Sequence, residues 1–159
     1  MLGPDATATT IDRISLDALW SEGVRGIVVD LDNTVVGYRE SELAANVKNW
    51  IAAALDRGFA VVMLSNNFSE RVAAIGAQLG IPTVSNALKP LPLGFARALG
   101  LLGTSKAQTV VVGDQLFTDV LGAKLFGLKA ILTEPLIARD HATTRVLRFL
   151  ERTIYRRRL

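Results

Sequence analysis

The residues of this chain that could do chemistry stand directly after short apolar runs. An Asp-Leu-Asp-Asn-Thr segment at 30–34 follows the first run, and Ser-Asn-Asn at 65–67 follows the second. Lys89 comes after the third run, and Asp114 follows the fourth, with Asp119 five positions beyond it. If the runs are parallel strands of one sheet, their carboxyl ends share one edge, where open α/β sheets bind ligands. We therefore expect three carboxylates and one lysine to meet in a single crevice, with hydroxyl and amide donors beside them.

The two aspartates of the first segment indicate a metal site. Asp30 and Asp32 are two residues apart at the end of an extended segment, so their side chains can lean to the same side. With Asp114 as a third carboxylate, the negative charges repel one another unless a cation neutralises them. Oxygen ligands of this kind suit Mg²⁺, which keeps several waters and takes one or two carboxylates together with a substrate phosphate. Mg²⁺ is therefore the predicted cofactor.

The lysine and the neutral donors indicate what the metal would face. Lys89, Ser65 and Asn66 can bind one anion, and a phosphate between a metal and a lysine is the arrangement that phosphoryl transfer needs. A carboxylate can also be the nucleophile and form an aspartyl-phosphate. A second aspartate would then act as general acid and afterwards as general base.

Each segment taken alone also has a purely structural explanation. Asp and Asn after a strand often form a turn or cap the next helix, and Ser-Asn-Asn is typical of turns. Lys89 alone could be a solvated surface charge, and Asp119 could favour the start of a helix. Their joint placement after four successive predicted strands favours a functional site.

Apolar runs and helical spacing alternate along the chain and predict an α/β fold. Strands are expected at 26–30, 59–64, 82–85, 109–113 and 129–132. Helices are expected at 15–22, from a Ser41 cap to Gly58, from a Ser69 cap to Gly80, from Pro90 and Pro92 to 102, at 117–126 and at 144–157. This order implies three layers: a Rossmann-like, mainly parallel sheet of about five strands with helices on both faces. Residues 1–159 are expected to form one domain, with 139–159 as a basic helical segment.

Composition excludes several classes of protein. The 159 residues include no cysteine, 50% are hydrophobic and 21% are charged, which excludes a disordered chain, a disulfide scaffold and a thiol nucleophile. The first ten residues lack both a basic patch and an apolar run, so we do not expect a signal peptide. No stretch approaches the ~20 apolar residues of a membrane span, so the expected location is the cytoplasm, with peripheral membrane attachment left open.

The net charge of +3 is unevenly distributed. Seven arginines against two acids give +5 to residues 139–159, which leaves −2 for residues 1–138. Four of these arginines, at 145, 148, 152 and 156, form one stripe of the predicted last helix. Such a helix could lie on an anionic lipid surface at the inner face of the membrane, or it could dock on the sheet with a solvated arginine face. Nucleic acid is not an expected partner, because an aromatic-rich platform for RNA is lacking.

The ordered segments at 30–34, 65–66, 89 and 113–119 resemble the four motifs of the haloacid dehalogenase-like (HAD) phosphatases. The resemblance covers about residues 24–133 and implies the HAD fold and a phosphatase. It implies that Asp30 is the nucleophile and Asp32 the general acid and base. Ser65 would bind phosphate, with Asn66 in the same phosphate loop.

The same resemblance assigns the remaining motif residues. Lys89 would steady the nucleophile and the transferring phosphoryl group. Asp114 would hold Mg²⁺ together with Asp30 and the backbone carbonyl of Asp32. Asp119 matches the second acidic position and would orient Lys89 or the waters of the metal, and Thr34 closes the first motif as a supporting residue.

A closer resemblance is to the capless subgroup, subclass IIIA, that includes the mitochondrial phosphatidylglycerophosphate phosphatase and its bacterial relatives. It is carried by Ser-Asn-Asn at 65–67, Leu-Lys-Pro at 88–90 and Gly-Asp-Gln-Leu-Phe-Thr-Asp-Val at 113–120. The intervals between the motifs have no room for a lid domain, so an open site is expected, with only a small flap at 35–40. The implied substrate is phosphatidylglycerophosphate, an anionic phospholipid. The alternatives are a soluble phosphatase for a small phosphoester or phosphoprotein, and a non-catalytic module that binds phosphate or a partner.

Overall fold

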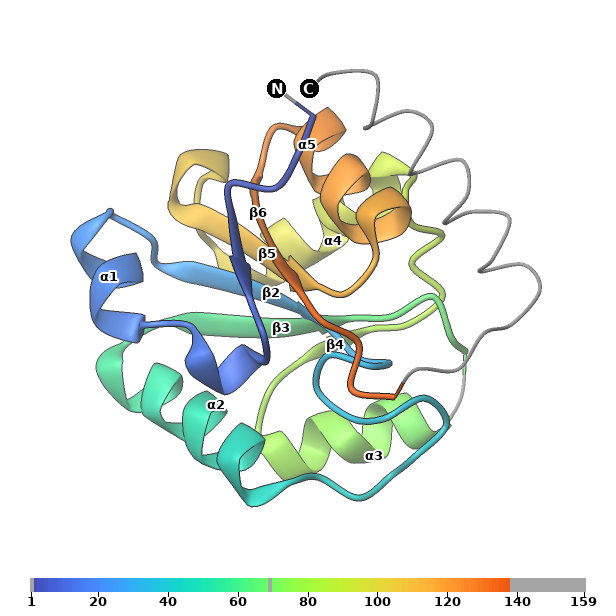
Figure 1. The fold of residues 1–159 in the computed structure, drawn as a ribbon. Coiled ribbons are helices and arrows are strands. Elements are labelled where there is room, and N and C mark those ends of the chain that lie inside the picture. Colours follow the sequence, from blue (N-terminus) through green and yellow to red (C-terminus); the bar gives the residue numbers. More distant parts are fainter. Residues whose placement is uncertain (1, 69, 138–159) are drawn as a thin grey trace.

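The computed structural model describes residues 2–68 and 70–137 and has three layers (Figure 1). Its centre is a six-stranded sheet in the order β1-β6-β5-β2-β3-β4, and every neighbouring pair of strands is parallel. The strands are β1 (Ala6–Ala8), β2 (Gly26–Asp30), β3 (Ala60–Leu64), β4 (Thr83–Val84), β5 (Thr109–Gly113) and β6 (Lys129–Thr133). The structure thus confirms the predicted α/β fold with a parallel sheet.

Helices cover both faces of the sheet, as expected for strands joined by helical crossovers. They are α1 (Leu16–Ser21), α2 (Ala45–Arg57), α3 (Glu70–Leu79), α4 (Pro92–Leu102) and α5 (Gly122–Phe126), with a π-type helical segment at Leu116–Leu121 and 3₁₀ turns at Ile11–Arg13 and Lys106–Gln108. In Figure 1, α2 and α3 lie on one side of the sheet, and α4 and α5 lie on the other. No second domain is inserted between the strands among the described residues, so nothing there forms a cap.

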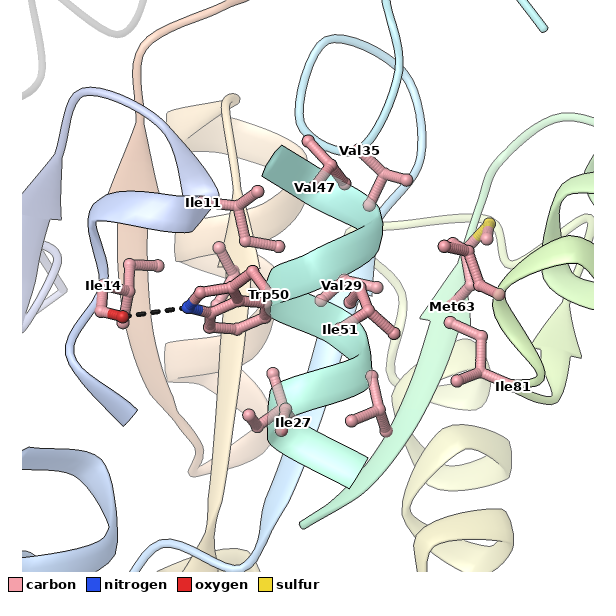
Figure 2. Packing of buried hydrophobic residues seen from close by; sticks show 14 of the residues in the cluster. Ile11, Ile14, Ile27, Val29, Val35, Val47, Trp50, Ile51, Met63 and Ile81 are labelled. Carbon is pink, nitrogen blue, oxygen red and sulfur yellow. Dashed lines mark hydrogen bonds between the residues drawn. The ribbon is translucent and has the colours of Figure 1, made fainter. Parts of the chain in front are cut away.

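Each face of the sheet has its own hydrophobic core, because successive strand residues point to opposite faces. Ile27 and Val29 of β2 join the cluster under α2 and α3, whereas Val28 joins the cluster under α4 and α5. Figure 2 shows the first cluster, where the Trp50 indole N–H donates to the Ile14 carbonyl at 2.9 Å. This bond satisfies the buried indole and ties the segment that follows the first 3₁₀ turn to α2.

Three local predictions differ from the structure or lie outside it. The sixth strand, β1, was not expected, because its Ala-Thr-Ala sequence has no apolar run; it forms by pairing with β6 at the sheet edge. Ser41 does not cap α2, which begins at Ala45 after Ala44, so the loop from β2 is longer than expected. The Ser69 cap and the 144–157 helix lie outside the described residues.

The strand order places one crevice at the centre of the sheet. From β2, the chain proceeds through β3 to β4 on one side, and then returns to place β5 and β6 on the other side. The reversal falls between β2 and β5, and ligands of open α/β sheets bind at such a point, beyond the carboxyl ends of the strands. Asp30 ends β2 and Gly113 ends β5, so the first and fourth motifs meet there. Among the described residues, no helix has the length and apolar character needed to cross a membrane.

Candidate active site

A buried lysine joins two carboxylates at the centre of the crevice. The Lys89 ammonium Nζ lies 2.5 Å from Oδ1 of Asp30 and 2.5 Å from Oδ1 of Asp119, and all three side chains are buried. Burial disfavours the charged lysine, but the charges of Asp119 and Asp30 outweigh it and raise the Lys89 pKa. Lys89 is therefore a permanent cation that holds the end of β2 against the helical segment that follows β5.

The loop that carries Lys89 is fixed by the second motif. The Asn66 side chain accepts a hydrogen bond from the Lys89 backbone N–H at 2.7 Å, and its amide group donates to the Lys89 carbonyl at 3.2 Å. Leu88 lies in the left-handed region at φ 56°, a conformation that a leucine rarely adopts outside a constrained site. The Asn66 amide therefore positions the lysine backbone, while the buried Ser65 hydroxyl accepts from the Asn67 N–H at 3.1 Å.

The acidic side chains form a cluster with an excess of negative charge. Carboxylate oxygens of Asp30, Asp114 and Asp119 lie within 4.8 Å of one another. With all three ionised and Lys89 protonated, three negative charges and one positive charge leave a net charge of −2. Burial raises the pKa of Asp30 to about 7, and burial with the neighbouring Asp30 and Asp119 charges raises the pKa of Asp114 to about 8. Buried carboxylates with raised pKa values bind either a proton or a metal cation, since each reduces the excess negative charge.

Two oxygens of the cluster are free to bind such a cation. Oδ2 of Asp30 and Oδ1 of Asp114 are buried and have no hydrogen-bond partner among the described residues. Both oxygens of Asp119 are engaged, one with Lys89 and the other with the Gln115 backbone N–H at 3.1 Å. The donor set therefore fits a hard divalent cation bound by Asp30 and Asp114, with Asp119 holding the lysine.

Asp32 is not one of the three clustered carboxylates, but its charge contributes to the raised pKa of Asp30. Its Oδ1 accepts from Arg71 Nη2 at 2.7 Å and from the Arg39 backbone N–H at 3.4 Å, and its Oδ2 accepts from the Asn67 amide. The expectation that Asp30 and Asp32 lean to the same side assumed an extended chain, but β2 ends at Asp30 and the chain turns from residue 31. The alternation of side chains along a strand therefore stops before Asp32.

The loop between β2 and α2 packs on the domain and does not form a large lid. Val35 and Val36 of the predicted flap are buried. Asn33 has φ 63°, and its side-chain oxygen accepts from the backbone N–H groups of Tyr38 and Ile137 at 3.2 Å each. Thr34 is buried, and its hydroxyl has no hydrogen-bond partner among the described residues. Within the described residues, this loop therefore adds no separate lid to the site.

Sequence reasoning did not single out Arg71, and it gave no individual role to Asn67 or Gly113, which lie within the predicted motifs. Arg71 and Asn67 hold Asp32, and a Cβ on Gly113 would overlap the carboxyl group of Asp119. A signal for Arg71 was present, because a cation in the first turn of a helix opposes the helix dipole unless an anion pairs with it. A signal for Gly113 was absent, because close approach between elements depends on the tertiary packing.

Comparison with known proteins gives a family for this arrangement. A sequence model of the haloacid dehalogenase-like hydrolases matches residues 16–127. The Bacillus subtilis protein named probable phosphatase YqeG is 36% identical over 151 residues, which cover 95% of this chain and 88% of that protein. The range matched by the family model includes the positions of all the predicted site residues, from Asp30 to Asp119.

Relatives of lower identity also match over most of the chain. The chloroplastic phosphatidylglycerophosphate phosphatase 1 of Chlamydomonas reinhardtii is 28% identical over 142 residues, and the match covers 84% of this chain but 53% of that protein. This chain thus spans about half the length of that relative. The solved structure of the deoxy-D-mannose-octulosonate 8-phosphate phosphatase from Haemophilus influenzae has a TM-score of 0.58 at 16% identity, covering 79% of this chain and 75% of that one. That similarity shows that the two proteins share a fold.

Replacement of Gly113 by alanine tests how closely the end of β5 must approach Asp119. The added Cβ overlaps the Asp119 carboxyl group, so Asp119 must shift and Lys89 loses its position. We expect Gly113→Ala to lower kcat/KM for p-nitrophenyl phosphate by about 100-fold, the effect of a misplacement of about 1 Å. The matched control is Gly100→Ala in α4, where a Cβ meets nothing within 4 Å and activity should be retained. Equal activity of the two variants would contradict the required approach.

Proposed function

This chain belongs to the haloacid dehalogenase-like hydrolases and is a phosphatase of that family; we propose that it is a Mg²⁺-dependent phosphomonoesterase that acts through an aspartyl-phosphate. The observation that carries the proposal is the arrangement of Asp30. One of its oxygens is held by Lys89 at 2.5 Å, and the other is buried beside Asp114, with no hydrogen-bond partner in the part of the chain that the structure describes. A carboxylate positioned by a cation and next to a site for a second cation is suited to attack an anionic phosphate.

In the first step, Asp30 forms a bond to phosphorus while the bond from phosphorus to the leaving oxygen breaks. Asp32 gives a proton to that oxygen, so the product leaves as an alcohol. Lys89 stays charged and faces the phosphoryl group from the side of Asp30, where it lowers the repulsion between the two anions. The Ser65 hydroxyl and the 65–67 loop are the proposed ligands of the remaining phosphate oxygens.

In the second step, water hydrolyses the aspartyl-phosphate. Asp32, now ionised, accepts a proton from the attacking water, and Asp30 is released as a carboxylate with inorganic phosphate as the product. Asp30 thus carries the covalent chemistry, and Asp32 moves the proton in both directions. Asp119 keeps Lys89 in place through its 2.5 Å ion pair.

Asp30, Asp114 and the backbone carbonyl of Asp32 are the proposed ligands of Mg²⁺. When bound, Mg²⁺ supplies positive charge that neutralises the acidic cluster and the substrate phosphate. The excess of two negative charges in the cluster and its two unpartnered oxygens support a divalent ion at this position.

We propose phosphatidylglycerophosphate as the substrate, reached from the cytoplasm at the inner face of the membrane. Two features support a lipid. The chain resembles a protein named as a phosphatidylglycerophosphate phosphatase, and the described residues include no cap that would enclose a small substrate. Small-molecule enzymes usually close a lid or domain over the substrate to exclude water, whereas a membrane surface could cover this site.

Exposed apolar side chains on the loops that carry the site give further support. Phe68 is 83% exposed and follows the 65–67 loop, and Leu88, Leu91 and Leu93 are exposed around Lys89. The two loops lie side by side, because the Asn86 N–H donates to the Asn67 carbonyl at 3.1 Å. Large apolar side chains grouped in this way often mark contact with a partner or a membrane. We call Phe68, Leu88, Leu91 and Leu93 the apolar rim.

Substitution of the nucleophile tests the proposed chemistry. Asp30→Asn removes the carboxylate that forms the bond to phosphorus, and we expect release of inorganic phosphate from p-nitrophenyl phosphate to fall by at least about 10³-fold. Asp17→Asn, at an exposed aspartate paired with Arg57, is the control and should retain full activity. An unchanged rate in Asp30→Asn would show that another group is the nucleophile.

Metal binding is tested by the unfolding temperature, which does not depend on turnover. A ligand that binds the folded protein at 100 times its Kd stabilises it by about 2.7 kcal/mol, so saturating Mg²⁺ should raise the Tm by several degrees. Asp114→Asn should lose most of this shift, whereas Asp17→Asn should keep it. An equal Mg²⁺-dependent rise in Tm in wild type and Asp114→Asn would exclude Asp114 as a ligand. In a separate activity assay, EDTA should abolish phosphate release from the wild type.

The lipid substrate is tested on vesicles and in solution with the same variants. We expect Phe68→Ser/Leu91→Ser to lower hydrolysis of vesicle-borne phosphatidylglycerophosphate by about 30-fold, because each of the two exposed side chains gains on the order of 1 kcal/mol from burial in lipid. Hydrolysis of p-nitrophenyl phosphate should not change. The control Leu101→Ser/Leu125→Ser removes two leucines that are also exposed but lie away from the rim.

Two outcomes of this comparison would point elsewhere. Faster hydrolysis of soluble phosphoesters than of phosphatidylglycerophosphate favours the soluble phosphatase, and no hydrolysis of any phosphoester favours a non-catalytic binding module.

The arginines at 139–159 lie outside the described residues, and their proposed contact with anionic lipid is measured by sedimentation with vesicles. Equal recovery with neutral and anionic vesicles would remove that proposal.

A further inference from the structure

Arg71, in the first turn of α3, links two parts of the loop that carries Asp32. Its Nη2 donates to Oδ1 of Asp32 at 2.7 Å, and its Nε donates to the Glu40 carbonyl at 2.6 Å. The ion pair is shielded, with the Arg71 and Asp32 side chains 18% and 13% exposed. Asp32 and Glu40 belong to the 31–44 loop between β2 and α2, so one guanidinium joins that loop at two points to a different element.

The position of Arg71 is unfavourable unless the ion pair forms. The N-terminus of a helix carries partial positive charge, so a cation in the first turn of α3 is repelled by it. The pairing with Asp32 and the bond to the Glu40 carbonyl offset this repulsion. Because the guanidinium presents its donors in a rigid planar fork, the two bonds define an orientation as well as a distance. A lysine at this position would supply only a point charge.

The two oxygens of Asp32 are thereby held from two sides. Arg71 binds Oδ1, while the Asn67 amide donates to Oδ2 from the loop of the second motif. The carboxylate of Asp32 is consequently oriented by α3 and by the 65–67 loop, whereas Asp30 is oriented by Lys89. The backbone places the two aspartates close together, since only Leu31 lies between them, and these separate contacts set the orientation of each carboxylate.

We propose that Arg71 is the positioning residue for Asp32: by joining Asp32 and the Glu40 carbonyl to α3, it holds the carboxyl group where it protonates the leaving oxygen. This inference rests on the proposed function, in which Asp32 is the general acid. A proton donor must lie within hydrogen-bond reach of the leaving oxygen, and a misplacement of about 1 Å can cost about 100-fold in rate. Arg71 itself does not need to touch the substrate.

The leaving group distinguishes a loss of positioning from a general loss of structure. An alkyl alcohol leaves poorly without a proton, whereas p-nitrophenolate leaves readily as an anion. The parameter kcat/KM includes steps only up to the departure of the leaving group, so it reports proton donation without the later hydrolysis. A misplaced Asp32 therefore lowers kcat/KM for an alkyl phosphate more than for an aryl phosphate.

The test compares Arg71→Ala with wild type on glycerol 3-phosphate and p-nitrophenyl phosphate. We expect kcat/KM to fall about 100-fold for the alkyl phosphate and less than about 5-fold for the aryl phosphate. Added guanidinium ion should restore part of the kcat/KM that Arg71→Ala loses. The Arg71→Lys variant should have a lower kcat/KM for the alkyl phosphate than wild type, because lysine lacks the planar fork of donors. Arg57→Ala is the matched control, since it breaks an exposed arginine–aspartate pair with Asp17 at the far end of α2.

The outcomes separate this inference from the proposed function. Equal losses on both substrates, without rescue by guanidinium, would overturn the positioning role and indicate a general disturbance of the fold, which the Tm measures independently. Unchanged kinetics in Arg71→Ala would also overturn it. If wild type hydrolyses neither substrate while Arg71→Ala and wild type have the same Tm, the proposed function fails instead, and the positioning role fails with it.

Discussion

The buried contact of Lys89 with Asp30 and Asp119 is the interaction on which the site depends. It joins residues 59 and 30 positions apart in the chain, and so connects β2, the loop before α4 and the segment after β5. Loss of one partner from a buried ion pair costs about 3–5 kcal/mol, because a charge is left uncompensated in a medium of low polarity. The lysine therefore combines a structural role with its proposed role at the phosphoryl group.

The acidic side chains of the site have two different cationic partners, Lys89 and Arg71. The Asp30, Asp114 and Asp119 cluster with Lys89 has an excess of two negative charges, which suits a divalent cation and a phosphate together. Asp32 is paired with Arg71 and forms a neutral unit. Like charges in a buried site raise each other's pKa, and the charge of Asp32 is one of the causes of the raised pKa of Asp30.

The surface around the site differs from that of an enclosed enzyme. The described residues contain no cap, the 31–44 loop packs on the domain, and the apolar rim surrounds the loop of Lys89. An open site must acquire its covering from the substrate or from a surface on which the substrate lies. The proposed phosphorylated lipid would supply both, with its headgroup in the site and neighbouring lipids against the apolar rim.

Apolar periodicity and strand-end polarity are local properties, so the order of residues was enough to predict the alternating strands and helices, the parallel sheet and the four segments that meet at its edge. The β1 strand was not predictable, because its three residues gain order only from pairing with β6, and neither was the turn that follows Asp30. Tertiary structure alone decided that Asn66 clamps the backbone of Lys89 and that Arg71 holds Asp32. Contacts between distant segments depend on how the elements pack in three dimensions. That packing is a property of the whole sequence and cannot be deduced from the type and spacing of a few residues.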